Sequence, residues 1–184
     1  MKIVAVNASA NKDGLTAMCA TAFLAGAEEA GAQVNLIHLK DCEIERCRMC
    51  VNGWGTCREL ATCVIADDFE RVRREILAAD AWVLATPVYF GDLSELAKAL
   101  MDRLRRCNIG SRGGQLKAKD FVAIAAAGGS GRGLGTCDEA LERLAGHTGM
   151  RLADLINVTR RNKLYKVDTI KAAGRAIVEQ AWEE

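Results

Sequence analysis

Four cysteines lie close together in the chain and could hold a metal. The 184 residues include eight cysteines, and the polar segment at about 41–66 contains Cys47, Cys50, Cys57 and Cys63. Four thiolates in one loop can bind a 4Fe–4S cluster or a structural zinc ion. Zinc ribbons usually carry two Cys-x-x-Cys pairs, and this segment has one, so the pattern favours zinc less than a 4Fe–4S cluster. Metal-free thiols, either packed or redox-active, are a third interpretation.

A polar segment at residues 7–17 could bind a phosphate group. Hydroxyl and amide side chains precede the start of a predicted helix, whose first backbone N–H groups attract anions. Neither a P-loop nor the Gly-x-Gly-x-x-Gly dinucleotide fingerprint is present, so a nucleoside triphosphate or a dinucleotide is not the expected ligand. An ordinary capped start of a helix is the alternative interpretation.

Two further segments could bind a planar ring. In residues 86–94, Pro87 fixes the backbone, Tyr89 and Phe90 offer flat apolar surface, and Gly91 permits close approach. Two adjacent aromatic side chains cannot easily both point into the core, which favours a ligand over a core-filling turn. Residues 127–133 are rich in glycine, and their backbone N–H groups could meet the polar edge of a flavin. Mere flexibility is the alternative for this third segment.

The elements that must position these segments alternate regularly. Apolar runs predict strands at 3–6, 34–39, 82–85, 121–125 and 152–158. Helical spacing of apolar residues predicts helices at 15–23, 69–76, 93–104, 137–145 and 170–181. Five strands alternating with five helices predict an α/β three-layer sandwich with a doubly wound parallel sheet, built as one domain over 1–184. Ligands of such sheets bind outside the carboxyl ends of the strands, where all three segments and the cysteine segment are expected.

The segment 86–103 resembles a known family. Thr86-Pro87-Val88-Tyr89-Phe90-Gly91, followed by Lys98 and Asp102-Arg103, is similar to the Pro-x-Tyr-x-Gly and Lys-x-x-x-Asp-Arg motifs of the flavodoxin-like NADPH-dependent FMN reductases. The resemblance extends over essentially the whole chain and implies bound FMN. It places the FMN phosphate on Ser9, Asn11, Thr16 and Ala17. It places the ring against Pro87, Val88, Tyr89, Phe90 and Gly91, beneath Gly128, Gly129 and Ser130.

The cysteine segment resembles a subgroup of the same family, the iron–sulfur flavoproteins. Their pattern is Cys-x2-Cys-x2-Cys-x4–7-Cys, ending before an Asp-Asp pair. Cys47 and Cys50 match its start, while Cys63 and Asp67-Asp68 match its end. The spacing between Cys50 and Cys57 is longer than in the pattern. The resemblance implies a 4Fe–4S cluster on Cys47, Cys50, Cys57 and Cys63, and zinc or metal-free thiols remain open.

Two main functions fit these features. The first is an FMN-dependent oxidoreductase that passes electrons from NAD(P)H to a flavin, a quinone or another acceptor. The second is an iron–sulfur flavoprotein that carries single electrons between protein partners. A flavin-free binding or regulatory domain is a third interpretation. No catalytic side chain is predicted, because the flavin itself performs hydride transfer and the protein positions it.

Composition excludes several partners and leaves others open. The net charge of +1 gives no reason to expect nucleic acid or an anionic membrane as a partner. No apolar run reaches the ~18 residues of a membrane span, and the chain enters a predicted strand at once, so a cytoplasmic location is expected. Relatives of this fold often form dimers or tetramers, and a homo-oligomer is expected by analogy.

The remaining cysteines and arginines receive simpler interpretations. Cys19, Cys107 and Cys137 lie on predicted helices and are interpreted as small buried apolar residues. Two arginine groups are interpreted as solvated charge: Arg103, Arg105 and Arg106, and Arg160 and Arg161. Arg132 is the one arginine expected to reach a flavin or nicotinamide phosphate.

Overall fold

A five-stranded parallel sheet forms the centre of the molecule. The computed structural model describes residues 1–110 and 114–179, so the predicted helix position Ala181 lies outside the described residues. The strands are β1 (Lys2–Asn7), β2 (Gln33–His38), β3 (Ala81–Pro87), β4 (Asp120–Ala127) and β5 (Arg151–Thr159). Their order is β2-β1-β3-β4-β5, and every neighbouring pair is parallel. The loops that follow β1 and β3 therefore flank a topological switch point.

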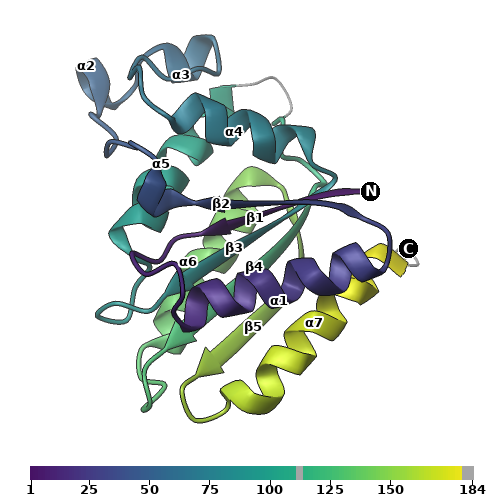
Figure 1. The fold of residues 1–184 in the computed structure, drawn as a ribbon. Coiled ribbons are helices and arrows are strands. Elements are labelled where there is room, and N and C mark those ends of the chain that lie inside the picture. Colours follow the sequence, from purple (N-terminus) through teal and green to yellow (C-terminus); the bar gives the residue numbers. More distant parts are fainter. Residues whose placement is uncertain (111–113, 180–184) are drawn as a thin grey trace.

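Five long helices of the described chain cover the two faces of the sheet (Figure 1). They are α1 (Leu15–Glu29), α4 (Phe69–Ala78), α5 (Glu95–Gly110), α6 (Leu134–Thr148) and α7 (Lys163–Glu179). Helices α1 and α7 pack against one face, and α4, α5 and α6 pack against the other. This arrangement is the three-layer α/β sandwich that the alternating pattern predicts.

The strands are apolar throughout because both faces of the sheet are buried. Alternate residues point to opposite faces: Val4, Trp82 and Phe121 lie under α4, α5 and α6, whereas Ile3 and Val83 lie under α1 and α7. The rings of Trp82 and Phe121 pack with their centroids 4.7 Å apart and their planes tilted by 31°. Two separate apolar cores therefore hold the sheet rigidly, and its carboxyl edge provides a firm base for the loops.

The cysteine segment leaves the sheet after β2 and lies on the outer side of α5 (Figure 1). It contains a 3₁₀ turn η1 (Leu39–Asp41) and two short helices, α2 (Cys50–Gly53) and α3 (Thr56–Glu59). Helix α3 packs directly on the end of α5, where a Cβ atom at Gly110 would collide with the carbonyl of Cys57. The cysteine segment is thus held against α5 rather than extended into solvent.

The predicted strands and long helices are confirmed, with ends of the helices shifted by up to seven residues. Leu39, predicted in the second strand, opens the 3₁₀ turn, and Leu93, predicted in a helix, lies before α5 begins. The short helices α2 and α3 are not indicated by apolar spacing, because they are too short to show a helical period. In the described ranges, no helix combines the length and apolarity needed to cross a membrane.

Candidate cofactor site and cysteine pocket

The loops after β1 and β3 are joined at the switch point by buried hydrogen bonds. The backbone N–H of Ala8 donates to the carbonyl of Ala85 at 2.8 Å. Ser94, which is 2% exposed, donates its hydroxyl to the carbonyl of Ala8 at 2.7 Å and accepts the N–H of Ala97 at 3.2 Å. One serine therefore caps the start of α5 and also fixes the distance between the two loops.

The segment after β1 combines an ordered turn with an uncapped helix start. Ser9 is buried, and its hydroxyl accepts the N–H of Asn11 at 3.1 Å. Helix α1 begins after Gly14 with no side-chain cap and no acidic residue in its first turn. Thr16 and Ala17 lie buried in that turn, whose N–H groups have no intrahelical partner. The geometry suits an anion at the start of α1, which is where the predicted phosphate contacts converge.

The nearest cation to this turn is engaged elsewhere. Lys12 forms an exposed ion pair with Asp41, with 2.9 Å between its Nζ and the carboxylate Oδ2. An anion at the start of α1 would therefore depend mainly on backbone N–H groups, hydroxyls and the helix dipole.

The aromatic segment after β3 forms a tight turn that projects outward. Tyr89 and Asp92 exchange two backbone hydrogen bonds, each 2.9 Å long. Phe90 and Gly91 between them have φ values of +52° and +78°, the left-handed pattern of a type I′ turn. Tyr89 is 45% exposed and Phe90 is fully exposed, so neither ring fills the core. An exposed phenylalanine in a left-handed conformation is a strained feature of the kind that clusters at functional sites.

The segments after β3 and β4 pack against each other through glycines. A Cβ atom on Gly133 would lie 2.5 Å from the Cα of Gly91, and Gly133 itself has a φ of +83°. The hydroxyl of Thr136 donates to the carbonyls of Gly91 and Gly133. Sequence reasoning assigned Gly91 to ligand approach and Gly133 to the glycine-rich segment, but it missed their contact and Thr136, because a contact between two loops leaves no local signal.

The other predicted ring contacts lie at the same edge of the sheet. Pro87 ends β3 and is buried, and Val88 donates its N–H to the carbonyl of Ala126 at 2.9 Å. Beside β4, a Cβ atom on Gly128 would meet nothing within 4 Å, and one on Gly129 would meet only Arg161. The predicted phosphate and ring residues thus lie on loops after β1, β3 and β4, which are neighbours in the sheet.

The four clustered cysteines line one pocket against α5. All four are half-buried free thiols, and they line a narrow pocket with a cavity volume of about 20 Å³. The structure also places there three residues of α5 that sequence reasoning did not assign to the pocket: Arg103, Arg106 and Cys107. Among the described residues, no three cysteine, histidine or acidic side chains converge on a position for a single metal ion. The thiols form the walls of the pocket and do not meet at its centre.

The backbone of the cysteine segment is strained. Met49, Val51 and Ala61 have φ values of +48°, +51° and +55°, although none is glycine. Val51 is 97% exposed, so its side chain makes no packing contact that would explain this conformation. Each such residue costs of order 1–3 kcal/mol, and such strain clusters where a ligand or a switch requires it.

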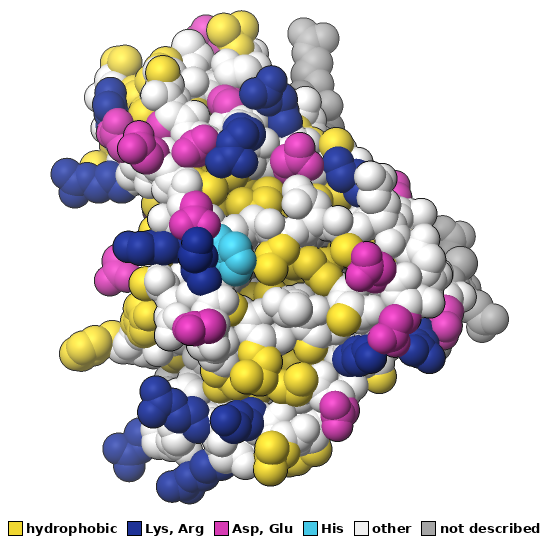
Figure 2. Space-filling model, viewed as in Figure 1, with side chains coloured by type: hydrophobic (Ala, Val, Ile, Leu, Met, Phe, Trp, Pro, Cys, Tyr) yellow, Lys and Arg dark blue, Asp and Glu magenta, His cyan; other side chains and the backbone are white. Residues whose placement is uncertain are grey.

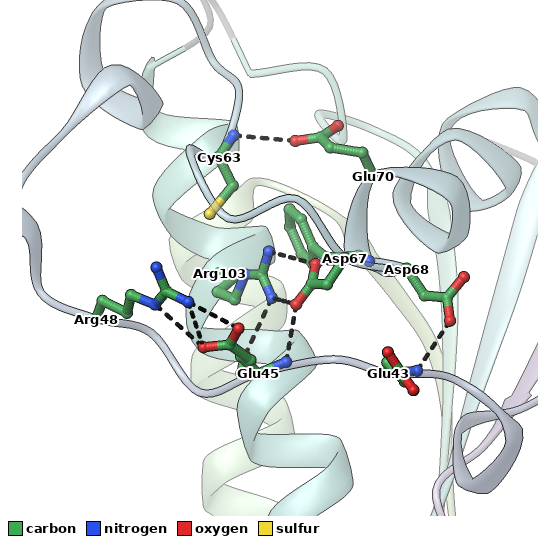
Figure 3. A network of polar contacts seen from close by, with 9 residues as sticks. Glu43, Glu45, Arg48, Cys63, Asp67, Asp68, Glu70 and Arg103 are labelled. Carbon is green, nitrogen blue, oxygen red and sulfur yellow. Dashed lines mark hydrogen bonds and ion pairs between the residues drawn. The ribbon is translucent and has the colours of Figure 1, made fainter.

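Arg103 of α5 joins the cysteine segment to the long helix (Figure 3). Its guanidinium donates to both carboxylate oxygens of Asp67, at 2.6 and 2.8 Å, and to the carbonyl of Glu45 at 3.0 Å. It also lies 4.2 Å above the ring of Phe69. The side chain is 1% exposed, so the interpretation of Arg103 as solvated charge is wrong. Its apolar partners and its bidentate acid lie far apart in the sequence, which is why spacing alone did not reveal them.

The Asp67 carboxylate is held in its charged form. Burial by itself would raise the pKa of Asp67, but hydrogen bonds from Arg103 and from the backbone N–H groups of Glu45 and Phe69 lower it overall. Opposed effects also act on Arg103: burial lowers its pKa, and Asp67 together with the Cys63 thiol raises it overall. Both groups therefore stay ionised as a buried, bidentate pair.

Cys107 has a more specific place than the sequence indicated. It is fully buried, as predicted, and burial raises its pKa to about 12. It lies one helical turn beyond Arg103, so positions 103, 106, 107 and 110 of α5 share the face toward the cysteine segment. That i, i+3, i+4, i+7 spacing was the available signal for this pocket face.

A 2-1-3-4-5 parallel sheet, with a helix start and glycine-rich loops at the β1/β3 switch point, defines a flavodoxin-like protein. The model of the NADPH-dependent FMN reductase family matches residues 1–160, and the chain belongs to that family.

Curated relatives agree with this family, and a solved structure shares the fold. An iron–sulfur flavoprotein from Methanocaldococcus jannaschii is 34% identical over 68% of this chain and 61% of its own length. One from Archaeoglobus fulgidus is 32% identical over 70% of this chain and 60% of its own length. The chain thus spans about 60% of the length of these relatives. An NAD(P)H:quinone oxidoreductase from Methanothermobacter marburgensis has a similar fold, with a TM-score of 0.72, 17% identity, and coverage of 100% of this chain and 99% of its own.

Proposed function

We propose that the chain is an FMN-dependent oxidoreductase that passes electrons from NAD(P)H to a flavin, a quinone or a similar acceptor. The observation that carries this proposal is the meeting of three loops at the β1/β3 switch point: a helix start, an aromatic turn and a glycine-rich loop. Membership of the FMN reductase family supports the same cofactor. We further propose that residues 1–184 act as one FMN-binding domain.

Each loop has a separate part in holding FMN. Ser9, Asn11, Thr16 and Ala17 would bind the phosphate at the start of α1, through hydroxyl, amide and backbone N–H groups. Pro87, Val88, Tyr89, Phe90 and Gly91 would support the ring, and Gly128, Gly129 and Ser130 would close over it. FMN supplies the hydride chemistry once bound. The protein's contribution would be orientation, since its loops would hold the ring for approach by a nicotinamide.

Exposed arginines beside the glycine-rich loop support an anionic electron donor. Arg132, Arg160 and Arg161 are exposed and, within the described ranges, form no ion pair. Arg161 lies 3.9 Å from the position of a Cβ atom on Gly129. Basic side chains gather in this region, where β5 leads into α7 (Figure 2, lower left). Such a rim attracts the phosphates of NAD(P)H to the flavin edge.

The test is anaerobic mixing of the flavin-loaded protein with NADPH or NADH. The proposal expects at least one nucleotide to bleach the visible flavin absorption. A flavin or quinone acceptor should then reoxidise the bound flavin over many turnovers. Dithionite serves as the control that the flavin is reducible. If dithionite bleaches the flavin but neither nucleotide does, the result contradicts an NAD(P)H-dependent enzyme and favours an electron carrier.

The cysteine pocket favours a second candidate, an iron–sulfur flavoprotein that relays single electrons. A 4Fe–4S cluster binds its four cysteines on four different irons, so thiols that line a pocket suit it better than thiols that meet at a point. The residues fit such a group: four half-buried thiols surround the space, and the buried Nε of Arg103 has no hydrogen-bond partner. The names of the curated relatives agree with this candidate. Cys47, Cys50, Cys57 and Cys63 would be the ligands.

Iron, acid-labile sulfide and zinc analysis of anaerobically purified protein separates the alternatives. About four irons and four sulfides per chain are expected for the relay. One zinc per chain identifies a structural site instead. If neither metal is found, the cysteines are packed or redox-active thiols. Colourless protein would contradict the flavin assignment itself and support a flavin-free domain.

We propose a dimer or tetramer as the assembly, because the fully exposed Phe90 beside the flavin loops offers an apolar contact.

A further inference from the structure

Arg103 has one donor that the protein leaves unused. Its two terminal nitrogens are fully engaged, by Asp67 and by the carbonyl of Glu45. Its Nε–H is buried and has no hydrogen-bond partner in the described part of the chain. Buried polar groups nearly always have a hydrogen-bond partner, because a buried group without one has lost its bonds to water and gained none in the protein. An orphan donor on a side chain that is 1% exposed therefore points to an acceptor that is complete only when a group is bound in the pocket.

The orphan donor belongs to the wall of the cysteine pocket. Arg103 lines that pocket together with Cys63, and the Cys63 thiol contributes to the raised pKa of Arg103. Figure 3 shows the sulfur of Cys63 directed toward the guanidinium. Cys63 is itself fixed, since its backbone N–H donates to the Glu70 carboxylate at 3.0 Å. A neutral thiol is a weak acceptor, whereas a metal-bound thiolate sulfur carries negative charge and accepts well.

A neighbouring arginine of α5 provides a contrast. Arg106 lines the same pocket, but its guanidinium donates to the carbonyl of Gly53 and lies 5.0 Å over the Trp54 ring. It has no buried nitrogen without a partner among the described residues. The two arginines bring similar charge to the pocket, and only Arg103 has a donor held free and buried in its wall.

We propose that the Nε–H of Arg103 donates a hydrogen bond to the Cys63 sulfur of a bound 4Fe–4S cluster, and so raises the reduction potential of that cluster. The inference rests on the cluster of the proposed function. A hydrogen bond to a ligand sulfur stabilises the cluster more when it gains an electron, because the negative charge on its sulfurs increases. Arg103 is a positioning residue in this scheme: Asp67 and Phe69 fix its orientation, and that orientation aims Nε.

The test compares Arg103→Lys with Arg106→Lys in the cluster-loaded protein. Lysine keeps the positive charge and can still pair with Asp67, but it lacks the Nε–H. We expect Arg103→Lys to retain iron and sulfide and to shift the cluster potential to more negative values in a redox titration. Arg106→Lys and the flavin potential should stay unchanged. Equal potentials in wild type and Arg103→Lys, or equal shifts in both variants, overturn the inference.

A second measurement uses a protein that keeps Arg103, in case Arg103→Lys does not load a cluster. In Arg106→Lys protein with ¹⁵N-labelled arginine, electron–nuclear double resonance of the reduced cluster should detect an arginine nitrogen and an exchangeable proton. If neither coupling is detected in an iron-loaded protein, the role of Arg103 is overturned, and the cluster itself stays a proposal. Wild-type protein that binds no iron under anaerobic reconstitution overturns the cluster, and with it the role of Arg103.

Discussion

At the scale of single residues, glycine decides how the two ring-binding loops meet. Gly133 combines a φ of +83° with a hypothetical Cβ only 2.5 Å from the Cα of Gly91. Gly135, two residues further along, has no neighbour within 4 Å of its hypothetical Cβ. The two positions therefore form a matched pair, one sterically closed and one open.

Gly133→Ala is expected to destabilise the protein and weaken FMN binding. Left-handed strain alone costs about 1–3 kcal/mol, and the contact with Gly91 adds to it by displacing the aromatic turn. Gly135→Ala in α6 should instead be neutral or stabilise by about 0.5–1 kcal/mol. Urea unfolding of the apoprotein and FMN titration measure the two effects. Equal behaviour of the two variants would show that the loop contact is not needed.

The ion pair of Arg103 and Asp67 is the second feature at this scale, and its neighbour provides a control. The Arg103–Asp67 side chains are 1% and 7% exposed, whereas those of Arg71 and Asp68 are 51% and 32% exposed. Removing one partner of a buried pair leaves an uncompensated charge, and an exposed pair is screened by water.

Asp67→Asn is expected to cost about 3–5 kcal/mol of unfolding free energy, and Asp68→Asn much less. The pKa of Asp67 is lowered in the fold, so its stabilisation is complete above the ordinary pKa of about 3.9 and is lost as pH falls through the folded value. The stability difference between wild type and Asp67→Asn should therefore shrink below about pH 4. Chemical unfolding of metal-free protein at several pH values measures it. A difference that stays constant into that range contradicts the ionised pair.

At the scale of elements, sequence patterns predicted most of what carries the site. Buried strands and amphipathic helices have strong local signals, so every strand and long helix was found, although some helix ends differ by six or seven residues. Loop position also followed, because parallel strands place their carboxyl ends at one edge. The exposed Tyr89 and Phe90 agree with the expectation that both rings could not point inward.

The cysteine segment shows what sequence patterns leave out. Its path depends on residues in the left-handed conformation such as Met49 and Val51. Because these are not glycines, the sequence gives no signal for that conformation. Its anchor on α5 depends on Arg103, which was interpreted as solvated charge because arginines are mostly exposed. Burial of this arginine follows from Asp67 and Phe69, and contacts across such sequence distances have no local pattern. Cys107 was correctly expected to be buried, but its place in the pocket was missed, although its helical spacing from Arg103 was an available signal.

At the scale of the whole molecule, the two candidate centres lie on different parts of one frame. The flavin loops stand on the carboxyl ends of β1, β3 and β4, and the cysteine pocket lies against the side of α5. Helix α5 connects them, because Ser94 at its start fixes the flavin loops and Arg103 in its body fixes the cysteine segment. Electrons that pass between a flavin and a cluster would therefore travel along α5.

The central claim is that the switch point binds FMN through its phosphate and its ring. Calorimetric titration of the apoprotein with FMN and with riboflavin, which lacks the phosphate, tests it most directly. The account predicts one FMN per chain and binding about a hundredfold tighter than that of riboflavin, as two charge-assisted hydrogen bonds to backbone N–H groups would give. Equal affinity for the two ligands, or no binding of either, would contradict it.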